Sequence, residues 1–278
     1  MQKLKFPHLI SGIVGVIMLL AAIVYVSPIF FVVINASKYG KDLLKPFLSL
    51  PSQWRMTNYS DAFKSLNLGR GFFNSAIITF FSVFLIIIFA SMASYAIARW
   101  ENKFTNMLYV SFVMGMVIPF SVIMVPSLKI LSFFKLSGKV GLIAMYVALG
   151  MSLAIFLITG FVKSSIPKEL EEAMYVDGAS TLTIFFKLVL PLLRPIIITM
   201  VLLDTVWVWN DFLLPTILLT SPDTFTLPVS LYNMTSEHFQ RWNLLFAAAI
   251  FAMLPIIILF FSCQKYIVKG ITEGSLKG

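Results

Sequence analysis

The strongest constraint on this chain is a set of six long apolar stretches. A helix needs roughly 20 mostly apolar residues to cross the hydrocarbon core of a bilayer. The stretches that meet this requirement are residues 10–34, 73–98, 106–128, 140–162, 195–219 and 244–266. We therefore expect an all-α, polytopic membrane protein in which six transmembrane helices form a single domain over residues 1–278.

The composition supports a membrane protein and excludes a nucleic-acid-binding one. Only 12% of the residues are charged, whereas a soluble domain has about 25%. The net charge of +9 could suggest a nucleic-acid partner. However, the basic residues are thinly spread at the ends of the apolar stretches and form no continuous stripe. Lipid headgroups are a better explanation for them.

The chain lacks the residue patterns expected of an enzyme. It contains no glycine-rich phosphate-binding loop. Its single cysteine, Cys263, lies in the last apolar stretch, and its two histidines, His8 and His238, have no metal-ligating neighbours at helical spacing. We expect no catalytic residues, no metal site and no cofactor bound by this chain.

Six spans would place both termini on the same side of the membrane. The 21 Lys and Arg residues divide 11 to 10 between the side of the termini and the opposite side. The positive-inside rule therefore does not decide the orientation. A long polar loop, residues 35–72, would lie opposite the termini.

The segment 163–194 is unusual for a loop because it has its own helical signals. Pro167 can occupy a first helical turn, and the acids Glu169, Glu171 and Glu172 are favourable near a positive helix end. An apolar stripe is expected from Leu170, Ala173 and Met174.

A second helix is expected after Gly178, which can end the first one in a left-handed conformation. Either Ser180 or Thr181 can cap this second helix, and Pro191 with Pro195 would end it. The residues alone allow two interpretations. The segment is either an ordinary interfacial amphipathic element or a docking element for a cytoplasmic partner.

The spacing of this segment resembles the loop of ABC importer permeases. The matching residues are Glu172-Ala173-Met174, then Gly178 after three residues, then Leu188-x-Leu190-Pro191 after nine more. The family has Ala where this chain has Met174 and Ile where it has Leu188, and both replacements remain apolar.

Further stretches are similar to the second permease of sugar importers of the maltose/multiple-sugar type. They are Phe73–Ser75, Ser94–Arg99, Trp209–Phe212 and Gly270–Gly278. The resemblance runs from the second span to the last residue. The first span and its following loop match only in general character.

The resemblance implies a bacterial cell-membrane protein with cytoplasmic termini that works in an assembly. The expected partners are a second homologous permease, two cytoplasmic ATPase subunits that bind ATP and Mg²⁺, and an extracytoplasmic sugar-binding protein. The expected cargo is a carbohydrate, with an oligosaccharide favoured. The loop 163–194 would couple to the ATPases through Glu169, Glu171, Glu172, Ala173, Met174, Asp177, Gly178, Ala179, Leu188 and Pro191.

Acidic residues in the fifth span suggest a substrate path. Asp204, Trp207 and Asp211 fall on one helical face, with Asn210 close to it, and charged residues within a span usually face an interior. These side chains suit the hydroxyl groups and apolar ring face of a neutral sugar. They could instead pair with the partner permease or line the bundle without touching sugar. Another alternative is an ion- or proton-coupled secondary transporter that uses Asp204, which would leave residues 171–191 unexplained.

Overall fold

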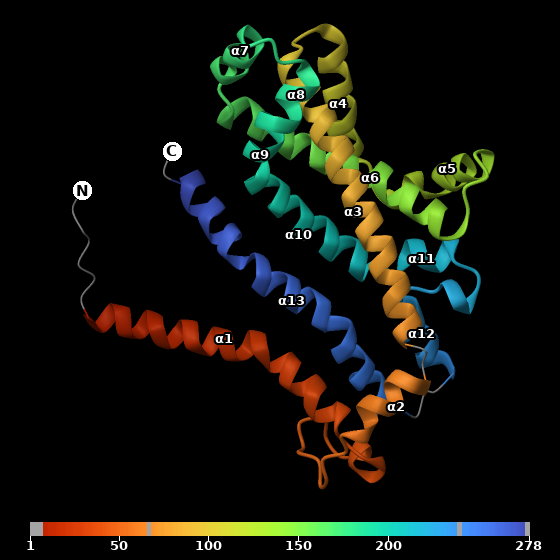
Figure 1. Ribbon diagram of the computed structural model, residues 1–278. Helices are drawn as coiled ribbons and strands as arrows, with labels where there is room; N and C mark the ends of the chain where they lie inside the picture. Colours follow the sequence, from red (N-terminus) through yellow and green to blue (C-terminus); the bar gives the residue numbers. More distant parts are fainter. Residues whose placement is uncertain (1–7, 66–67, 238–240, 276–278) are drawn as a thin grey trace. The chain divides into compact units, whose positions relative to one another are not determined.

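The structure is a computed structural model that describes residues 8–65, 68–237 and 241–275 (Figure 1). Within these ranges every regular element is a helix. The longer helices are α1 (His8–Ala36), α2 (Thr57–Ser65), α3 (Leu68–Arg99), α4 (Lys103–Val117), α5 (Phe120–Phe133), α6 (Gly138–Ser165), α7 (Lys168–Val176), α10 (Arg194–Asn210), α12 (Leu227–Glu237) and α13 (Trp242–Ser275). The shorter ones are η1 (Gly40–Leu44), α8 (Thr181–Ile184), η2 (Phe185–Val189), α9 (Leu190–Leu192), α11 (Leu213–Leu218) and η3 (Pro222–Thr224).

The chain forms two compact units. One comprises Met1–Gly69 and Leu231–Met253, and the other comprises Arg70–Ser230 and Leu254–Gly278. The first unit contains α1 and the loop after it. The second contains α3 to α11 and the candidate site.

Four of the six predicted spans are single helices, long and apolar enough to cross a membrane. These helical stretches are Gly12–Ala36, Leu68–Arg99, Gly138–Ser165 and Trp242–Gln264. Two further helix pairs pass the same test together but are sharply bent. Among the described residues the structure therefore has four candidate spans, or up to six if each bent pair counts as one.

The predicted third span, residues 106–128, is wrong as a single helix. α4 and α5 meet there at 116°. The break falls at Ile118, whose backbone is extended, immediately before Pro119. A proline ring disfavours a helical conformation in the residue before it and has no N–H to continue the hydrogen-bond ladder. Pro119 therefore separates two helices within the predicted span.

The predicted fifth span, residues 195–219, also needs correction. α10 ends at Asn210, and Asp211 is extended. The Asp211 carboxylate accepts a hydrogen bond from the Leu213 N–H at 3.1 Å at the start of α11. A short acid that binds nearby backbone in this way competes with helix continuation. At its other end α10 meets the helical run Thr181–Leu192 at a bend of 72°. The predicted residues 195–219 therefore form two helices, α10 and α11.

The core of the second unit lies between α3, α6, α10 and the helical run 181–192. Its buried members include Ile86, Ile155, Phe185 and Met200. Gly150 of α6 permits a close approach, since a Cβ there would lie 2.5 Å from Cδ1 of Ile86 on α3. Close packing at this point fixes α3 against α6.

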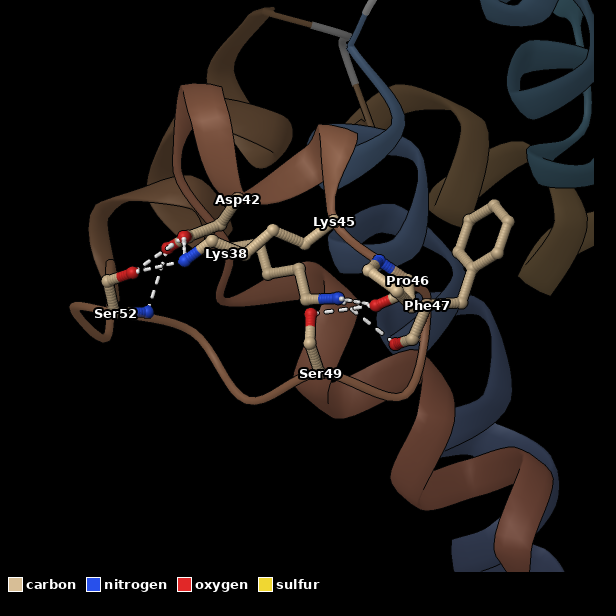
Figure 2. A network of polar contacts seen from close by, with 7 residues as sticks. All are labelled: Lys38, Asp42, Lys45, Pro46, Phe47, Ser49 and Ser52. Atoms are coloured by element: carbon tan, nitrogen blue, oxygen red, sulfur yellow. Dashed lines mark hydrogen bonds and ion pairs between the residues drawn. The ribbon is translucent and has the colours of Figure 1, made fainter.

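The loop after α1 is a folded structure, organised by three charged side chains (Figure 2). Buried Lys38 donates from Nζ to the carbonyl oxygens of Phe47 at 3.0 Å and Pro46 at 3.3 Å. The Asp42 carboxylate accepts two hydrogen bonds from Ser52. The Ser52 N–H donates one at 2.8 Å, and the Ser52 hydroxyl donates the other at 2.7 Å. The Lys45 ammonium lies 2.7 Å from the same carboxylate. Residues 38–52 of the predicted polar loop therefore have a defined structure.

These contacts shift the pKa values of both buried groups. Hydrogen bonds from Lys45 and Ser52 lower the pKa of the Asp42 carboxyl to about 2. Burial lowers the pKa of the Lys38 ammonium, while the neighbouring charge of Asp42 opposes that shift. The first unit thus contains an ionised carboxylate fixed by three donors.

Candidate functional site

The segment after α6 folds as two helical arms joined at Gly178. α7 ends in a turn where the N–H of Ala179 donates to the Met174 carbonyl at 3.0 Å and the N–H of Gly178 donates to the Tyr175 carbonyl at 3.0 Å. Gly178 has φ +84°. This pair of bonds with a left-handed residue after the helix is the Schellman motif. The predicted glycine turn is confirmed.

The second arm begins at Thr181, with Ser180 as its N-cap. The Ser180 hydroxyl accepts a hydrogen bond from the Thr183 N–H at 3.3 Å, which selects Ser180 from the two predicted caps. The helical run ends at Leu192, between Pro191 and Pro195, which were predicted to end it together. Pro191 itself lies inside α9. The π-helical turn η2 precedes it. The wider turn suits a following residue that has no N–H to donate. We call α7 to α9 the hairpin.

The predicted apolar stripe of α7 is divided between the surface and the core. Leu170 and Ala173 are exposed. Met174 does pack against the core. Glu171 is the buried member of the helix, with 5% of its surface accessible. An acid in this position must have compensating partners.

Glu171 has three such contacts, all from the last turns of α3. The Tyr95 hydroxyl donates to Glu171 Oε2 at 2.8 Å. Arg99 Nε donates to Oε1 at 2.8 Å, and Arg99 Nη2 forms an ion pair with the same oxygen at 2.7 Å. The sequence pattern gave no signal for this pairing, since Glu171 and Glu172 are equally acidic and adjacent.

The outer surface of the hairpin carries acids beside large apolar side chains. The acids Glu169, Glu172 and Asp177 are exposed. The apolar residues Val176, Leu182 and Phe186 are exposed as well, and Val176 reaches 88%. The Tyr175 hydroxyl lies 3.1 Å from the Thr181 hydroxyl, which connects the two arms. We call Glu172, Val176, Leu182 and Phe186 the outer patch.

The remaining predicted coupling residues do not belong to the outer patch. Ala179 and Leu188 pack against the core of the second unit. Pro191 is exposed in α9. These residues support the hairpin from within or from its far end.

The four predicted substrate-path residues are only partly brought together. Trp207 contacts Tyr146 of α6 in an edge-to-face arrangement, with ring centroids 5.4 Å apart. The Tyr146 hydroxyl donates to Asp211 at 2.8 Å. Asn210 is exposed and donates to the Val206 carbonyl of its own helix. Tyr146 thus joins Trp207 to Asp211, and no sequence feature distinguished it within its apolar stretch.

Asp204 lies in a different environment from Trp207, Tyr146 and Asp211. Only 2% of its surface is accessible, and its Oδ2 has no hydrogen-bond partner in the described parts of the chain. It lies one turn after buried Met200 and one turn before buried Val208. Asp204 therefore faces the packed interior of the second unit.

A cavity of about 420 Å³ opens on a neighbouring face of α10. Its lining comes from α3, α10 and the later part of α13, and α10 contributes Val201, Thr205 and Trp209. None of the four predicted substrate-path residues lines it. The lining is almost wholly apolar. Trp209 belongs to the stretch Trp209–Phe212, whose resemblance to sugar importers was noted from sequence.

The chain belongs to the family of binding-protein-dependent transport system inner membrane components, whose family model matches residues 86–273. A probable starch degradation products transport system permease protein, AmyC of Thermoanaerobacterium thermosulfurigenes, is 35% identical over 277 residues and covers 100% of both chains. The melibiose/raffinose/stachyose import permease protein MelC of Bacillus subtilis is 37% identical over 269 residues, covering 95% of this chain and 96% of the relative.

Solved structures share the fold. A chain of a bacterial ABC transporter involved in the import of the acidic polysaccharide alginate aligns with a TM-score of 0.81 at 21% identity. The alignment covers 96% of this chain and 99% of that one. The family match and the helical fold together confirm the predicted class, an ABC importer permease.

Proposed function

We propose that this chain is the transmembrane permease subunit of an ATP-driven ABC importer for carbohydrate. Relatives that cover nearly its full length are named for transport of starch degradation products and of melibiose, raffinose and stachyose. A second homologous permease completes the translocation path. In this proposal an oligosaccharide is the cargo, and both termini lie in the cytoplasm of a bacterial cell.

In this proposal the outer patch of the hairpin couples the chain to the ATPase. A cytoplasmic ATPase subunit seats on it, because Val176, Leu182 and Phe186 present apolar surface to solvent on a turn fixed by Gly178. Exposed apolar patches of this kind mark sites of protein association. Glu172 adds a charge that can orient a basic partner. ATP and Mg²⁺ bind to the ATPase subunits, and this chain performs no catalysis.

An extracytoplasmic binding protein delivers the sugar in this proposal. A solved bacterial alginate ABC transporter that shares the fold is in complex with an alginate pentasaccharide-bound periplasmic protein, which supports an assembly of this type. Trp207 and Asn210 are exposed on α10 and can offer a ring face and an amide to a sugar. Asp211, held by Tyr146, adds a carboxylate that can accept hydrogen bonds from the hydroxyl groups of a neutral carbohydrate.

A co-purification experiment tests the coupling surface. The chain is expressed with its companions, and the amount of ATPase that it retains is measured. We expect Val176→Asp to lose most of the ATPase, because a charge in an apolar contact costs desolvation. Leu44→Asp is the matched control, since Leu44 is 90% exposed in the loop after α1 and should retain the ATPase. Equal retention by both variants would contradict the proposal.

Uptake of labelled oligosaccharides in a deletion strain tests the cargo. The wild-type chain should restore uptake of at least one neutral oligosaccharide, and an ATPase variant unable to hydrolyse ATP should abolish it. Uptake that persists without ATP hydrolysis would favour an ion- or proton-coupled transporter. In that case Asp204 would be the candidate ion- or proton-binding residue. Its buried carboxylate has an oxygen with no hydrogen-bond partner in the described chain.

A further inference from the structure

The last turns of α3 are held by both arms of the hairpin. Glu171 of α7 receives hydrogen bonds from Tyr95 and Arg99. The Tyr95 ring also packs against Phe185 at the start of η2, with centroids 5.6 Å apart. The contacts come from two stretches of sequence more than 70 residues apart, Ser94–Arg99 and the coupling segment. The proposed function gives no role to the stretch Ser94–Arg99.

The ion pair is protected from water. The side chains of Arg99 and Glu171 are 10% and 7% exposed, so the pair is far less screened than a surface pair. Arg99 Nη2 also donates to the carbonyl of Ile166 at 2.7 Å, the residue that immediately follows α6. One guanidinium therefore joins α3, α6 and α7. Loss of one partner from a buried pair leaves an uncompensated charge, which is strongly unfavourable.

α3 then extends from this junction to the rest of the second unit. Its residues line the cavity beside α10, and Ile86 packs against Gly150 of α6. Switching transitions commonly shift packed helices as whole elements. Figure 1 shows α7 near the end of α3 that carries Arg99.

We propose that α7 and the terminal turn of α3 form one mechanical unit closed by Glu171, Arg99 and Tyr95. Glu171 is then a positioning residue within this chain and does not contact the ATPase. A displacement of the hairpin passes directly to α3 through this junction. The inference rests on the proposed function, because the displacement comes from the ATPase.

A cross-linking experiment on the assembled transporter tests whether the two segments move together. An exposed ion pair beside the junction, Lys168 to Glu101 at 3.8 Å, marks neighbouring positions on α7 and just after α3. Cysteines replace both residues in a Cys263→Ser background, and a short cleavable thiol cross-linker joins them. If the segments form one unit, the cross-linked transporter keeps at least about half of its ATP-driven uptake. A larger loss that reverses on cleavage overturns the proposal.

A substitution experiment tests the role of Glu171 itself. We expect Glu171→Gln to lower the sugar transported per ATP hydrolysed by about tenfold, since the buried Arg99 loses its counter-charge. Glu101→Gln removes the exposed pair and should leave the ratio unchanged, because surface pairs contribute little. An unchanged ratio for Glu171→Gln overturns the proposal. If the Glu171→Gln variant does not assemble, the cross-linking experiment decides whether α7 and the end of α3 move as one unit.

The two levels of proposal fail in distinguishable ways. If the wild-type assembly takes up no sugar when supplied with ATP, the proposed function is wrong. If the wild type transports normally but cross-linking blocks it reversibly, only the mechanical unit is wrong.

Discussion

At Gly178 the backbone takes φ +84°, and a Cβ placed there would meet nothing within 4 Å. Glycine is therefore preferred at this position because of its backbone conformation. A side chain would have enough space. A left-handed conformation costs an ordinary L-residue roughly 1–2 kcal/mol, whereas Asn tolerates it better. The two hydrogen bonds that end α7 depend on this one residue.

We predict that Gly178→Val reduces uptake far more than Gly178→Asn. Both side chains have room, so the difference reports backbone strain of about 1 kcal/mol or more. The measurement is initial uptake rate, normalised to the amount of protein in the membrane. Equal rates for the two variants, both near wild type, would show that the turn need not be held in this conformation.

A second prediction concerns Asp42, whose pKa is lowered to about 2 by Lys45 and Ser52. A carboxyl with a depressed pKa contributes stability above its unfolded pKa of about 3.9. That contribution is lost as the pH falls towards 2. We expect wild type to unfold at a higher temperature than Asp42→Asn at neutral pH, with a constant difference down to about pH 4.

Below pH 4 the difference between the two proteins should shrink. Thermal unfolding in detergent, followed by circular dichroism, provides the measurement. A difference that stays the same down to about pH 2 would mean that Asp42 acts through shape and not through charge.

Among the helices, the contact between α3 and α6 is sensitive to volume. A Cβ at Gly150 would lie 2.5 Å from the buried Cδ1 of Ile86. We predict that Gly150→Ala destabilises the protein by about 1–3 kcal/mol, the usual range for overpacking. Ile86→Val removes the clashing atom, so the double variant should be less destabilised than the sum of the single ones.

A double-mutant cycle on denaturation in detergent measures this coupling. Strictly additive effects would show that α6 shifts to accommodate the methyl group without help from Ile86.

Helix existence was predictable from sequence where the apolar pattern was long and unbroken. α3, α6 and the hairpin turn at Gly178 follow from residue types whose local preferences are strong. The break between α4 and α5 was not predicted, because a proline in a membrane helix can produce either a kink or a full separation. The outcome depends on tertiary packing.

The buried residue of α7 was not predictable for a related reason. Leu170, Ala173 and Met174 have the periodicity of an apolar stripe, yet Glu171 is the residue that the structure buries. Helical periodicity finds apolar faces, and it cannot anticipate an acid whose partner, Arg99, lies 72 residues earlier in the chain. The same applies to Asp211, where Tyr146 and the Leu213 N–H fix the carboxylate.

For the whole molecule, the bent pair α4–α5 decides on which side of the membrane each loop lies. The loop after α1 and the hairpin are separated by α3, this pair and α6. If the pair crosses the membrane, three crossings place the two regions on opposite sides. If it returns to its starting side, two crossings place them on the same side. The Lys and Arg distribution does not decide on which side of the membrane each region lies. The accessibility of single residues to a reagent outside the cell can decide it.

We predict that the pair crosses, with the loop after α1 outside the cell and the hairpin in the cytoplasm. Single cysteines at Gln53 and Lys168, in a Cys263→Ser background, are exposed positions in the two regions. A membrane-impermeant thiol reagent should label Gln53→Cys in intact cells and Lys168→Cys only in inverted vesicles. Labelling of both from the same side would make α4–α5 a re-entrant pair, because its 116° bend would then return the chain to the surface it left.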